Sequence, residues 1–265
     1  PAGIFVKSFP DDPRLSECLR VTVGRRAENR RFIAAMDEAR SPKTLLFDMD
    51  GVLVDVSGSY RKAIERTVSR FSGKRVSPAE IQRWKRRPEM NNDWDVTAAI
   101  LKAKGKSVPR RELISFFQEL YLGRDGRPGL NRSERWLLPK PVLIRLAARH
   151  RLGIVTGRPR KDARLALRQF GMSRYFRLVI AREDAGSRQK PDPYGLRLAL
   201  RRLGARPAFY FGDSPADMIA ARKAGCSAVA VCPPRSSDRR AWRRRMAEAG
   251  AVRIAESLEA EMENF

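Results

Sequence analysis

Two aspartates separated by one residue follow a short apolar run near residue 45. Asp48 and Asp50 come directly after residues 44–47, and Gly51 comes next. Both carboxylates can face one site only if the chain leaves strand geometry, which a glycine permits. One carboxylate can then attack phosphorus, while the other protonates the leaving oxygen and later activates water. The pair therefore indicates phosphoryl-transfer chemistry.

Two later segments offer groups that could bind a phosphate. A phosphate ester carries close to two negative charges, so two bare carboxylates would repel it. Thr156, Gly157 and Arg158 bring a hydroxyl and backbone N–H groups, and Lys190 brings an ammonium group. We predict that these residues hold the phosphoryl oxygens.

A third segment offers carboxylates for a hard cation. Asp213 and Asp217 lie in Gly212-Asp213-Ser214-Pro215-Ala216-Asp217. Magnesium takes an octahedral shell of oxygen ligands, so we predict Mg²⁺ as cofactor, held by Asp48, the carbonyl of Asp50 and Asp213. Asp217 either joins this set or only braces its loop.

The histidine and the cysteines do not favour zinc. Cys18, Cys226 and Cys232 are odd in number and lack CxxC spacing, so neither a disulfide framework nor a thiolate site is indicated. The single histidine, His150, falls at the end of an expected helix, where a positive charge suits the helix dipole. We interpret it as structural.

Short apolar runs end at the polar segments. Residues 44–47, 152–155 and 208–211 are each followed by a turn and a helical pattern. This alternation predicts an α/β fold, a Rossmann-like parallel sheet with helices on both faces. Ligands of such folds bind at the carboxyl ends of the strands.

The chain between the first two runs reads as helical. Residues 60–71 and 110–122 carry apolar residues at helical spacing, residues 77–80 form a capping box, and Asp93 is expected to cap a helix over residues 94–104. We predict a helical cap at residues 57–138, a core made of residues 43–56 and 139–265, and a separate β-β-α segment at residues 1–42.

Taken together and in this order, the four polar segments resemble the motifs of the haloacid dehalogenase superfamily. The resemblance covers about residues 43–235, and the helical cap after the first motif is similar to that of subfamily IA, the phosphoglycolate-phosphatase-like branch. It implies these roles: Asp48 as nucleophile, Asp50 as general acid and base, Thr156, Gly157 and Lys190 as phosphate ligands, and Asp213 with Asp217 as metal support.

The second aspartate bears on the type of reaction. Members of the superfamily that cleave carbon–halogen bonds lack an acid there, and transport ATPases of this class carry Thr. Asp50 therefore favours a phosphatase acting on a small phosphorylated metabolite, with a β-phosphoglucomutase-like phosphomutase as an alternative.

A polar cluster inside the cap is a candidate for substrate selection. Asn91, Asn92, Asp93 and Asp95 surround Trp94 at an expected helix start, and Arg158 is a further candidate. The cluster either faces the substrate or only caps the helix, with Trp94 packed inward.

Residues 3–9 and 19–29 resemble the C-terminal end of a histidinol-phosphate aminotransferase. The resemblance implies fusion or association with histidine-biosynthesis enzymes and makes histidinol phosphate the leading substrate. The alternative is a packing remnant beside the core. Known phosphatases of this superfamily that act on histidinol phosphate carry a Cys/His zinc loop, which this sequence lacks.

The formal net charge is +25, from 55 basic and 30 acidic residues. Such a chain attracts anions, but its basic residues are spread out and match no nucleic-acid motif. Solvated helix faces are therefore favoured, and action on nucleic acid is the alternative. No apolar run approaches the length of a transmembrane helix, so we expect no membrane contact and a cytoplasmic location. The opening at Pro1 rather than Met suggests a fragment of a longer polypeptide.

Overall fold

The computed structural model describes residues 7–8, 19–22, 24–85, 87, 90, 92–204, 207–234 and 238–265. The chain divides into two compact units, Pro1–Pro42 and Lys43–Phe265. The expected strand at residues 3–6, together with Cys18 and Asn91, lies outside the described residues.

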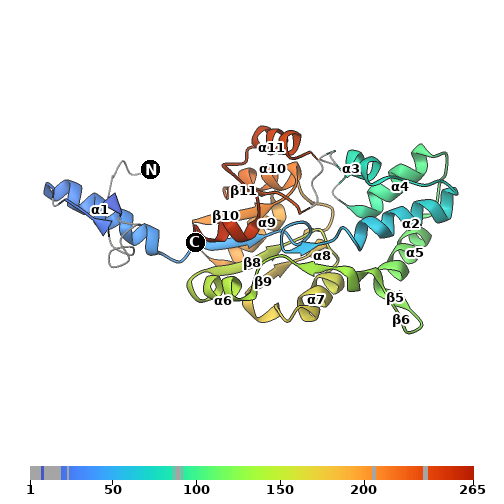
Figure 1. Cartoon of the computed structure of the whole chain (residues 1–265), viewed down its shortest axis with the longest axis horizontal. Helices are drawn as coiled ribbons and strands as arrows, with labels where there is room; N and C mark the ends of the chain where they lie inside the picture. Colours follow the sequence, from blue (N-terminus) through green and yellow to red (C-terminus); the bar gives the residue numbers. More distant parts are fainter. Residues whose placement is uncertain are drawn as a thin grey trace. The chain divides into compact units, whose positions relative to one another are not determined.

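The first unit contains two short strands and a helix. β1 (Lys7–Ser8) pairs antiparallel with β2 (Leu19–Arg20), and α1 (Arg26–Arg40) follows. The Glu28 carboxylate accepts a hydrogen bond from the backbone N–H of Arg25 at 2.7 Å, so a side chain from the first turn satisfies a donor that the helix leaves open. The helix lies where the sequence predicts it (Figure 1).

The second unit is built on a six-stranded parallel sheet, which confirms the predicted α/β class. Its order is β12-β11-β10-β3-β8-β9. The strands are β3 (Thr44–Phe47), β8 (Arg151–Val155), β9 (Leu178–Ile180), β10 (Ala208–Gly212), β11 (Ser227–Val231) and β12 (Arg253–Ala255).

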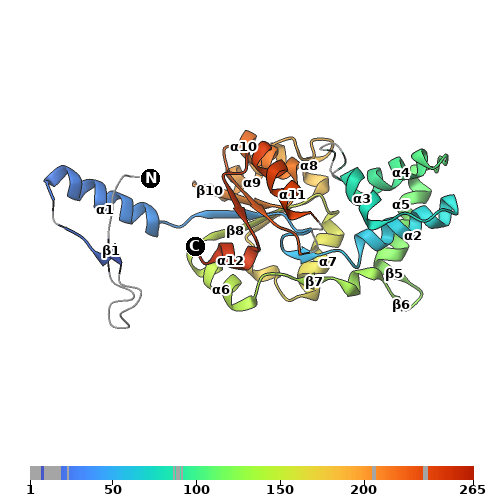
Figure 2. The ribbon, with the colours of Figure 1, turned by 45° about the horizontal axis from the view of Figure 1, so that its top comes forward.

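Both faces of the sheet are covered by helices. Alternate residues of β3 belong to different cores: Leu45 and Phe47 pack with residues of α6, α7 and α12, whereas Leu46 packs with residues of α9, α10 and α11. Figures 1 and 2 show these helices on opposite sides of the strands. The helical elements of the sheet region are α6 (Lys140–Arg149), α7 (Arg160–Gln169), η2 (Ser173–Tyr175), α8 (Arg182–Ala185), α9 (Tyr194–Leu203), α10 (Pro215–Ala224), α11 (Arg239–Glu248) and α12 (Leu258–Met262).

A group of helices is inserted between β3 and β8, and we refer to it as the cap. It contains α2 (Tyr60–Ser72), α3 (Pro78–Lys85), α4 (Asp93–Ala103), α5 (Arg110–Leu122), the hairpin of β5 (Gly123–Arg124) and β6 (Arg127–Pro128), and η1 (Leu130–Ser133). These elements gather on one side of the sheet in both views (Figures 1 and 2).

The two chain segments that join the cap to the sheet run side by side. β4 (Val54–Asp55) leads into the cap, β7 (Arg135–Trp136) leads out of it, and the two pair antiparallel. The glycine-containing stretch from Gly123 to Gly129, which the sequence suggests as the start of the return hinge, forms the β5–β6 hairpin instead. The return linker lies a few residues later, at Glu134 and β7.

The cap helices begin slightly differently from the prediction. Asn92, not Asp93, is the N-cap of α4, because its side-chain oxygen accepts from the backbone N–H of Trp94 at 3.1 Å. The Ser77 hydroxyl caps α3 by accepting from the N–H of Glu80 at 3.1 Å. The Glu80 carboxylate, however, lies 3.1 Å from the ammonium of Lys104, so we find half of the predicted capping box.

His150 ends α6 as predicted, but the reason offered from the sequence is wrong. Its Nδ1 accepts from the backbone N–H of Lys43 at 3.2 Å, so Nε2 carries the proton and donates to the Phe265 backbone oxygen at 3.0 Å. Burial lowers the pKa of His150, which favours the neutral ring over a charge on the helix dipole. Cys226 and Cys232 are buried. Within the described part of the chain, no helix is long and apolar enough to span a bilayer.

Candidate active site

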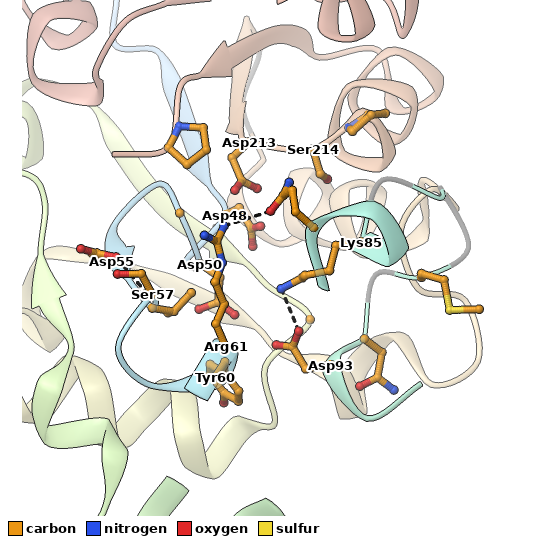
Figure 3. A pocket seen from close by; sticks show the side chains of 18 of the residues that line it. Asp48, Asp50, Asp55, Ser57, Tyr60, Arg61, Lys85, Asp93, Asp213 and Ser214 are labelled. Atoms are coloured by element: carbon orange, nitrogen blue, oxygen red, sulfur yellow. Dashed lines mark hydrogen bonds and ion pairs between the residues drawn. The ribbon is translucent and has the colours of Figure 1, made fainter. Parts of the chain in front are cut away.

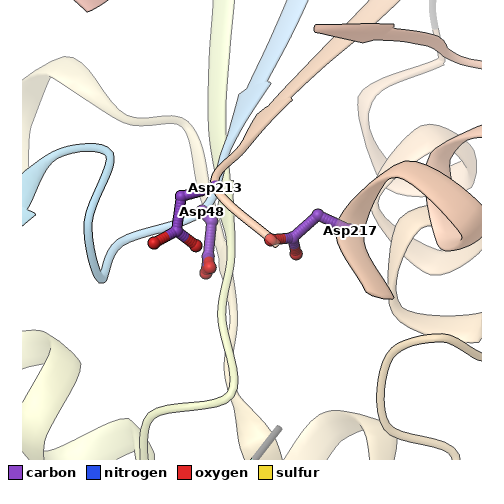
Figure 4. A group of neighbouring side chains, drawn as sticks. All are labelled: Asp48, Asp213 and Asp217. Atoms are coloured by element: carbon purple, nitrogen blue, oxygen red, sulfur yellow. The ribbon is translucent and has the colours of Figure 1, made fainter. Parts of the chain in front are cut away.

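Three acidic residues meet at the carboxyl ends of neighbouring strands. Asp48 follows β3 and Asp213 follows β10, and these two strands pair in parallel register. Asp217 comes from the first turn of α10. One carboxylate oxygen from each of the three lies within 4.8 Å of the others, and Figure 4 shows the carboxylates turned toward a common space. The parallel register explains why residues 165 positions apart become neighbours.

Lys190 supplies positive charge beside this cluster. Its ammonium lies 3.0 Å from Asp48 Oδ1 and 2.6 Å from Asp217 Oδ1, and it donates to the Tyr210 hydroxyl at 3.0 Å. Burial opposes a charged ammonium, but the neighbouring carboxylates outweigh it and raise the pKa of Lys190. The predicted phosphate ligand is therefore held charged at the nucleophile.

Asp217 makes contacts that favour the bracing interpretation. Its Oδ2 accepts from the backbone N–H of Ser214 at 3.0 Å and from the Ser214 hydroxyl at 2.6 Å, while Oδ1 accepts from the Tyr210 hydroxyl at 3.2 Å and faces Lys190. The side chain is completely buried. It fixes the loop that carries Asp213 and anchors the ammonium of Lys190.

The donor set fits a hard divalent cation. Burial is the largest influence on both exposed ends of the cluster: it raises the pKa of Asp48 to about 7, with Lys190 opposing, and the pKa of Asp213 to about 8, with Asp217 and Asp48 adding repulsion. A cation would stabilise the ionised forms of both. Gly51 also lies close, since a Cβ there would come 2.2 Å from Asp213 Oδ2. The loop after Asp48 is thereby brought against the Asp213 carboxylate.

Asp50 lies on the cavity wall and faces Arg158. The Arg158 Nε donates to Asp50 Oδ1 at 2.5 Å. Arg158 is only 2% exposed, and its other nitrogens contact Glu134 and Tyr121. The expectation that Arg158 reaches the substrate as a cap residue is therefore corrected, because it belongs to the core loop after β8 and its guanidinium is engaged within the protein.

Thr156 and Gly157 precede Arg158 in the loop. Gly157 lines the cavity. Thr156 is buried, does not appear among the cavity-lining residues, and its hydroxyl oxygen accepts from the Arg158 backbone N–H at 3.2 Å. The hydroxyl hydrogen of Thr156 is not used by that bond, so the residue still has a donor for a phosphate oxygen.

A cavity of about 480 Å³ lies between the sheet edge and the cap. Figure 3 shows Asp48, Asp50 and Asp213 on the core side, and Lys85 with Asp93 on the cap side. The Lys85 ammonium lies 2.7 Å from Asp93 Oδ1. Burial lowers the pKa of Lys85, but the Asp93 charge and its hydrogen bond outweigh burial and leave that pKa raised.

The predicted cap cluster divides into two groups. Asn92, Asp93 and Trp94 line the cavity, and the Arg182 guanidinium lies 4.9 Å from the centre of the Trp94 ring. Asp95 does not line it: its Oδ1 pairs with Arg110 at 2.6 Å and its Oδ2 accepts from Asn92 at 2.6 Å. The helix turn thus sends Asp93 and Asp95 in different directions.

Several cavity residues have no signal in the sequence pattern. Lys85 stands in a Lys-Arg-Arg run that reads as a solvated basic face, yet it is the cap lysine nearest the carboxylates. Tyr60 and Glu134 stand in no motif, and the partner of Arg158 could not be read from spacing. Only the boundaries of the cap pointed to them, because linkers between a cap and a core pass close to the site.

The fold and this site define a class of enzyme: an α/β phosphatase with an acidic cluster and a lysine at the strand ends, beneath a helical cap. The family model for haloacid dehalogenase-like hydrolases matches residues 42–225. The chain belongs to this family, which confirms the resemblance found in the motifs.

Similar proteins support a phosphatase. The chain is 25% identical over 199 residues to phosphoglycolate phosphatase 1 of Pseudomonas aeruginosa, covering 72% of this chain and 70% of that protein. It is 38% identical over 202 residues to a protein of Phytophthora nicotianae named imidazoleglycerol-phosphate dehydratase, covering 73% of this chain but only 44% of that protein.

A solved structure agrees with the fold. Phosphatase Tt82 from Thermococcus thioreducens superposes with a TM-score of 0.61 at 24% identity, covering 83% of this chain and 98% of that one. The family match begins at residue 42, so the aminotransferase-like interpretation of residues 1–42 stays a hypothesis.

Proposed function

We propose that this phosphatase is a magnesium-dependent phosphomonoester hydrolase that works through an aspartyl-phosphate on Asp48. The observation that carries the proposal is the placement of the Asp48 carboxylate 3.0 Å from the buried ammonium of Lys190, within the acidic cluster at the strand ends. A nucleophile, a positive charge and a set of cation ligands thereby share one space that opens into the cavity.

The chemistry assigns one role to each aspartate. A carboxylate oxygen of Asp48 bonds to phosphorus as the bond from phosphorus to the leaving oxygen breaks, and Asp50 gives that oxygen a proton. A water molecule then attacks phosphorus, Asp50 takes its proton, and the bond to Asp48 breaks. The products are the free alcohol and inorganic phosphate, and both carboxyl groups return to their starting forms.

The remaining core residues hold the phosphoryl group and the cation. Lys190, the Thr156 hydroxyl and the backbone N–H of Gly157 bind phosphoryl oxygens, while Asp48, Asp213 and the carbonyl of Asp50 would hold Mg²⁺. When bound, the ion supplies positive charge that stabilises the charge on the transferring group. Asp217 acts by fixing Lys190 and the loop of Asp213.

For the substrate, we propose histidinol phosphate. The resemblance of residues 1–42 to an aminotransferase that acts on this compound supports it. So does the similarity to the Phytophthora protein, whose name describes action on an imidazole-bearing phosphate ester. Asp93 is the one carboxylate that the described cap residues present to the cavity, and it could receive the substrate amine in place of Lys85.

A second candidate is a carboxylate-bearing ester such as phosphoglycolate, the substrate named for several relatives. The cationic side chains of Arg61, Lys85 and Arg182 line the same cavity and would attract a second negative group. The two candidates place opposite charges near Lys85, so a single cap residue can separate them.

The proposal is tested with Asp48→Asn. An amide is no nucleophile, so magnesium-dependent phosphate release should fall to background while thermal unfolding stays close to that of the parent. Acid quenching of the parent protein during turnover of a ³²P-labelled ester should trap an acyl phosphate that hydroxylamine cleaves. Phosphate release near the parental rate in Asp48→Asn would end the assignment.

The substrate is tested by phosphate release from histidinol phosphate, phosphoglycolate and a 5′-phosphorylated oligonucleotide. A kcat/KM for histidinol phosphate at or below the other two would reject it as the substrate. Nucleic acid would also be recognised by a steep fall of affinity with salt.

A further inference from the structure

The Arg158 side chain stands out because it is a charged group in the fully buried interior. It is 2% exposed and is among the largest fully buried side chains of the described residues. Its Nε donates to Asp50 Oδ1 at 2.5 Å, and its Nη1 and Nη2 donate to the two oxygens of Glu134 at 3.1 Å each. A guanidinium buried this deeply is stable only when carboxylates compensate its charge.

Glu134 connects this guanidinium to the cap. It lies on the return linker, just before β7, and is buried. Its Oε1 accepts from the hydroxyl of Ser59, at the start of α2, at 2.8 Å and from the hydroxyl of Tyr121, at the end of α5, at 3.2 Å. The linker, two cap helices and Arg158 therefore share one carboxylate.

Asp50 depends on this arrangement for its orientation. It follows the end of β3 and stands before Gly51, whose backbone lies in the left-handed region at a φ of 78°. Among the described residues, Arg158 makes the one printed side-chain hydrogen bond to Asp50. A carboxylate on a turn can adopt several rotamers, and a planar guanidinium with a fixed set of donors selects among them.

We propose that Arg158, anchored by Glu134, is the positioning residue for the general acid and base Asp50. The proposal rests on the proposed function, since it assumes that Asp50 transfers the proton. Arg158 itself touches neither the phosphoryl group nor the leaving group. It holds one oxygen of Asp50 so that the other can serve the leaving group and, later, the attacking water.

The chemistry provides a test that a merely structural role would not satisfy. An alkyl alcohol is a poor leaving group and needs the proton of Asp50, whereas p-nitrophenolate leaves without one. Misplacing Asp50 should therefore slow the first phosphoryl transfer from an alkyl ester far more than from p-nitrophenyl phosphate. The first turnover must be measured, because hydrolysis of the aspartyl-phosphate needs Asp50 with either substrate.

The experiment compares Arg158→Lys with two other variants of the full chain. Lysine keeps the charge but cannot bridge Asp50 and Glu134 with a rigid fork. Asp50→Asn sets the loss expected when the proton donor is removed. Arg135→Lys is the matched control, because Arg135 belongs to the same linker and pairs with Asp55 at 2.9 Å, yet its side chain is 66% exposed and does not contact Asp50.

Rapid quenching should show a roughly 10- to 100-fold slower first turnover of the alkyl ester in Arg158→Lys, a part of the 10²- to 10⁴-fold that general acid catalysis supplies. The first turnover of p-nitrophenyl phosphate should change by about threefold or less, as should KM for both esters. Arg135→Lys should leave both rates within about twofold of the parent, in line with an exposed ion pair. If Arg158→Lys does not fold, Glu134→Gln carries the same prediction, since it removes the charge that anchors the guanidinium.

Equal losses on the two esters in both Arg158→Lys and Glu134→Gln would overturn the positioning role while leaving the aspartyl-phosphate mechanism intact. Equal losses in Asp50→Asn would instead remove Asp50 as the acid, so the failure would lie in the proposed function.

Discussion

The core side and the cap side of the cavity hold their charged groups in different ways. On the core side, Lys190 and Asp217 are buried and share a network with Asp48 and the Tyr210 hydroxyl. Asp213 is held through its backbone, because its carbonyl accepts from the indole N–H of Trp242 at 2.9 Å. On the cap side, the charge of Lys85 is balanced by Asp93 through one ion pair.

This difference matches what each side has to recognise. The phosphoryl group is the same in every ester, so the core can hold its ligands in one arrangement fixed by strand ends and buried bonds. The rest of the substrate varies, and it meets helices whose polar groups are more easily rearranged. Reaction type should therefore fail when core residues change, and substrate preference should shift when cap residues change.

The largest effect is expected for Lys190→Met. It removes the charge that faces the nucleophile and leaves Asp48 and Asp217 buried without their cation. Removing one partner of a buried pair costs about 3–5 kcal/mol of unfolding free energy, and losing a charge that stabilises the transition state lowers kcat by about 100-fold or more.

Urea unfolding and phosphate release at low temperature measure the two losses separately. Arg110→Met is the control, because it also removes a cation from an ion pair, but from the exposed outer side of the cap. A Lys190→Met protein that keeps most of its kcat on every ester would break the distinction between the two sides of the cavity.

The core side could be predicted from the sequence because strand ends determine it. Asp48, Thr156 and Asp213 each follow a short apolar run, and parallel strands bring their carboxyl ends to one edge. The order of the motifs then identified the family. Only the role of Asp217 was left open, since both candidate roles use the same carboxylate at the same position.

The cap side could be predicted only as helices. Helical spacing identifies the buried face of each helix, but it does not say which turn reaches the cavity, and Lys85 at the end of α3 was missed for that reason. Asn92 and Asp93 are both good N-cap residues, so the pattern could not choose between them. The contact of Arg158 with Asp50 joins residues 108 positions apart, and no local pattern encodes it.

A shift in substrate preference is expected for Lys85→Met. The change removes a positive charge from the cavity and frees Asp93, so an amine-bearing ester should gain relative to a carboxylate-bearing one. A charged hydrogen bond contributes about 1.5–3 kcal/mol, which corresponds to a change of about 10- to 100-fold in the ratio of the two kcat/KM values. Lys85→Arg keeps the charge and should preserve the ratio. An unchanged ratio in Lys85→Met, measured on histidinol phosphate and phosphoglycolate, would remove the cap wall as the selector.

The smallest effect is expected for Asp95→Ala, although the sequence made Asp95 a candidate for substrate contact. Asp95 pairs with Arg110 at side-chain exposures of 38% and 57% and does not line the cavity. An exposed pair contributes about 0–1 kcal/mol, and salt screens it. Unfolding free energy should therefore fall by about 1 kcal/mol or less, with a smaller loss at high salt.

Substrate preference should not change in Asp95→Ala, because the residue lies on the far side of the helix turn from Asp93. The kcat/KM values for histidinol phosphate and phosphoglycolate should both stay within about twofold of the parent, the range expected when only an exposed pair is lost. Asp93→Ala is the matched variant, since it removes a carboxylate from the same turn but from the cavity side. A selective loss on one ester in Asp95→Ala, equal to that in Asp93→Ala, would mean that α4 turns on substrate binding and that both carboxylates select the substrate.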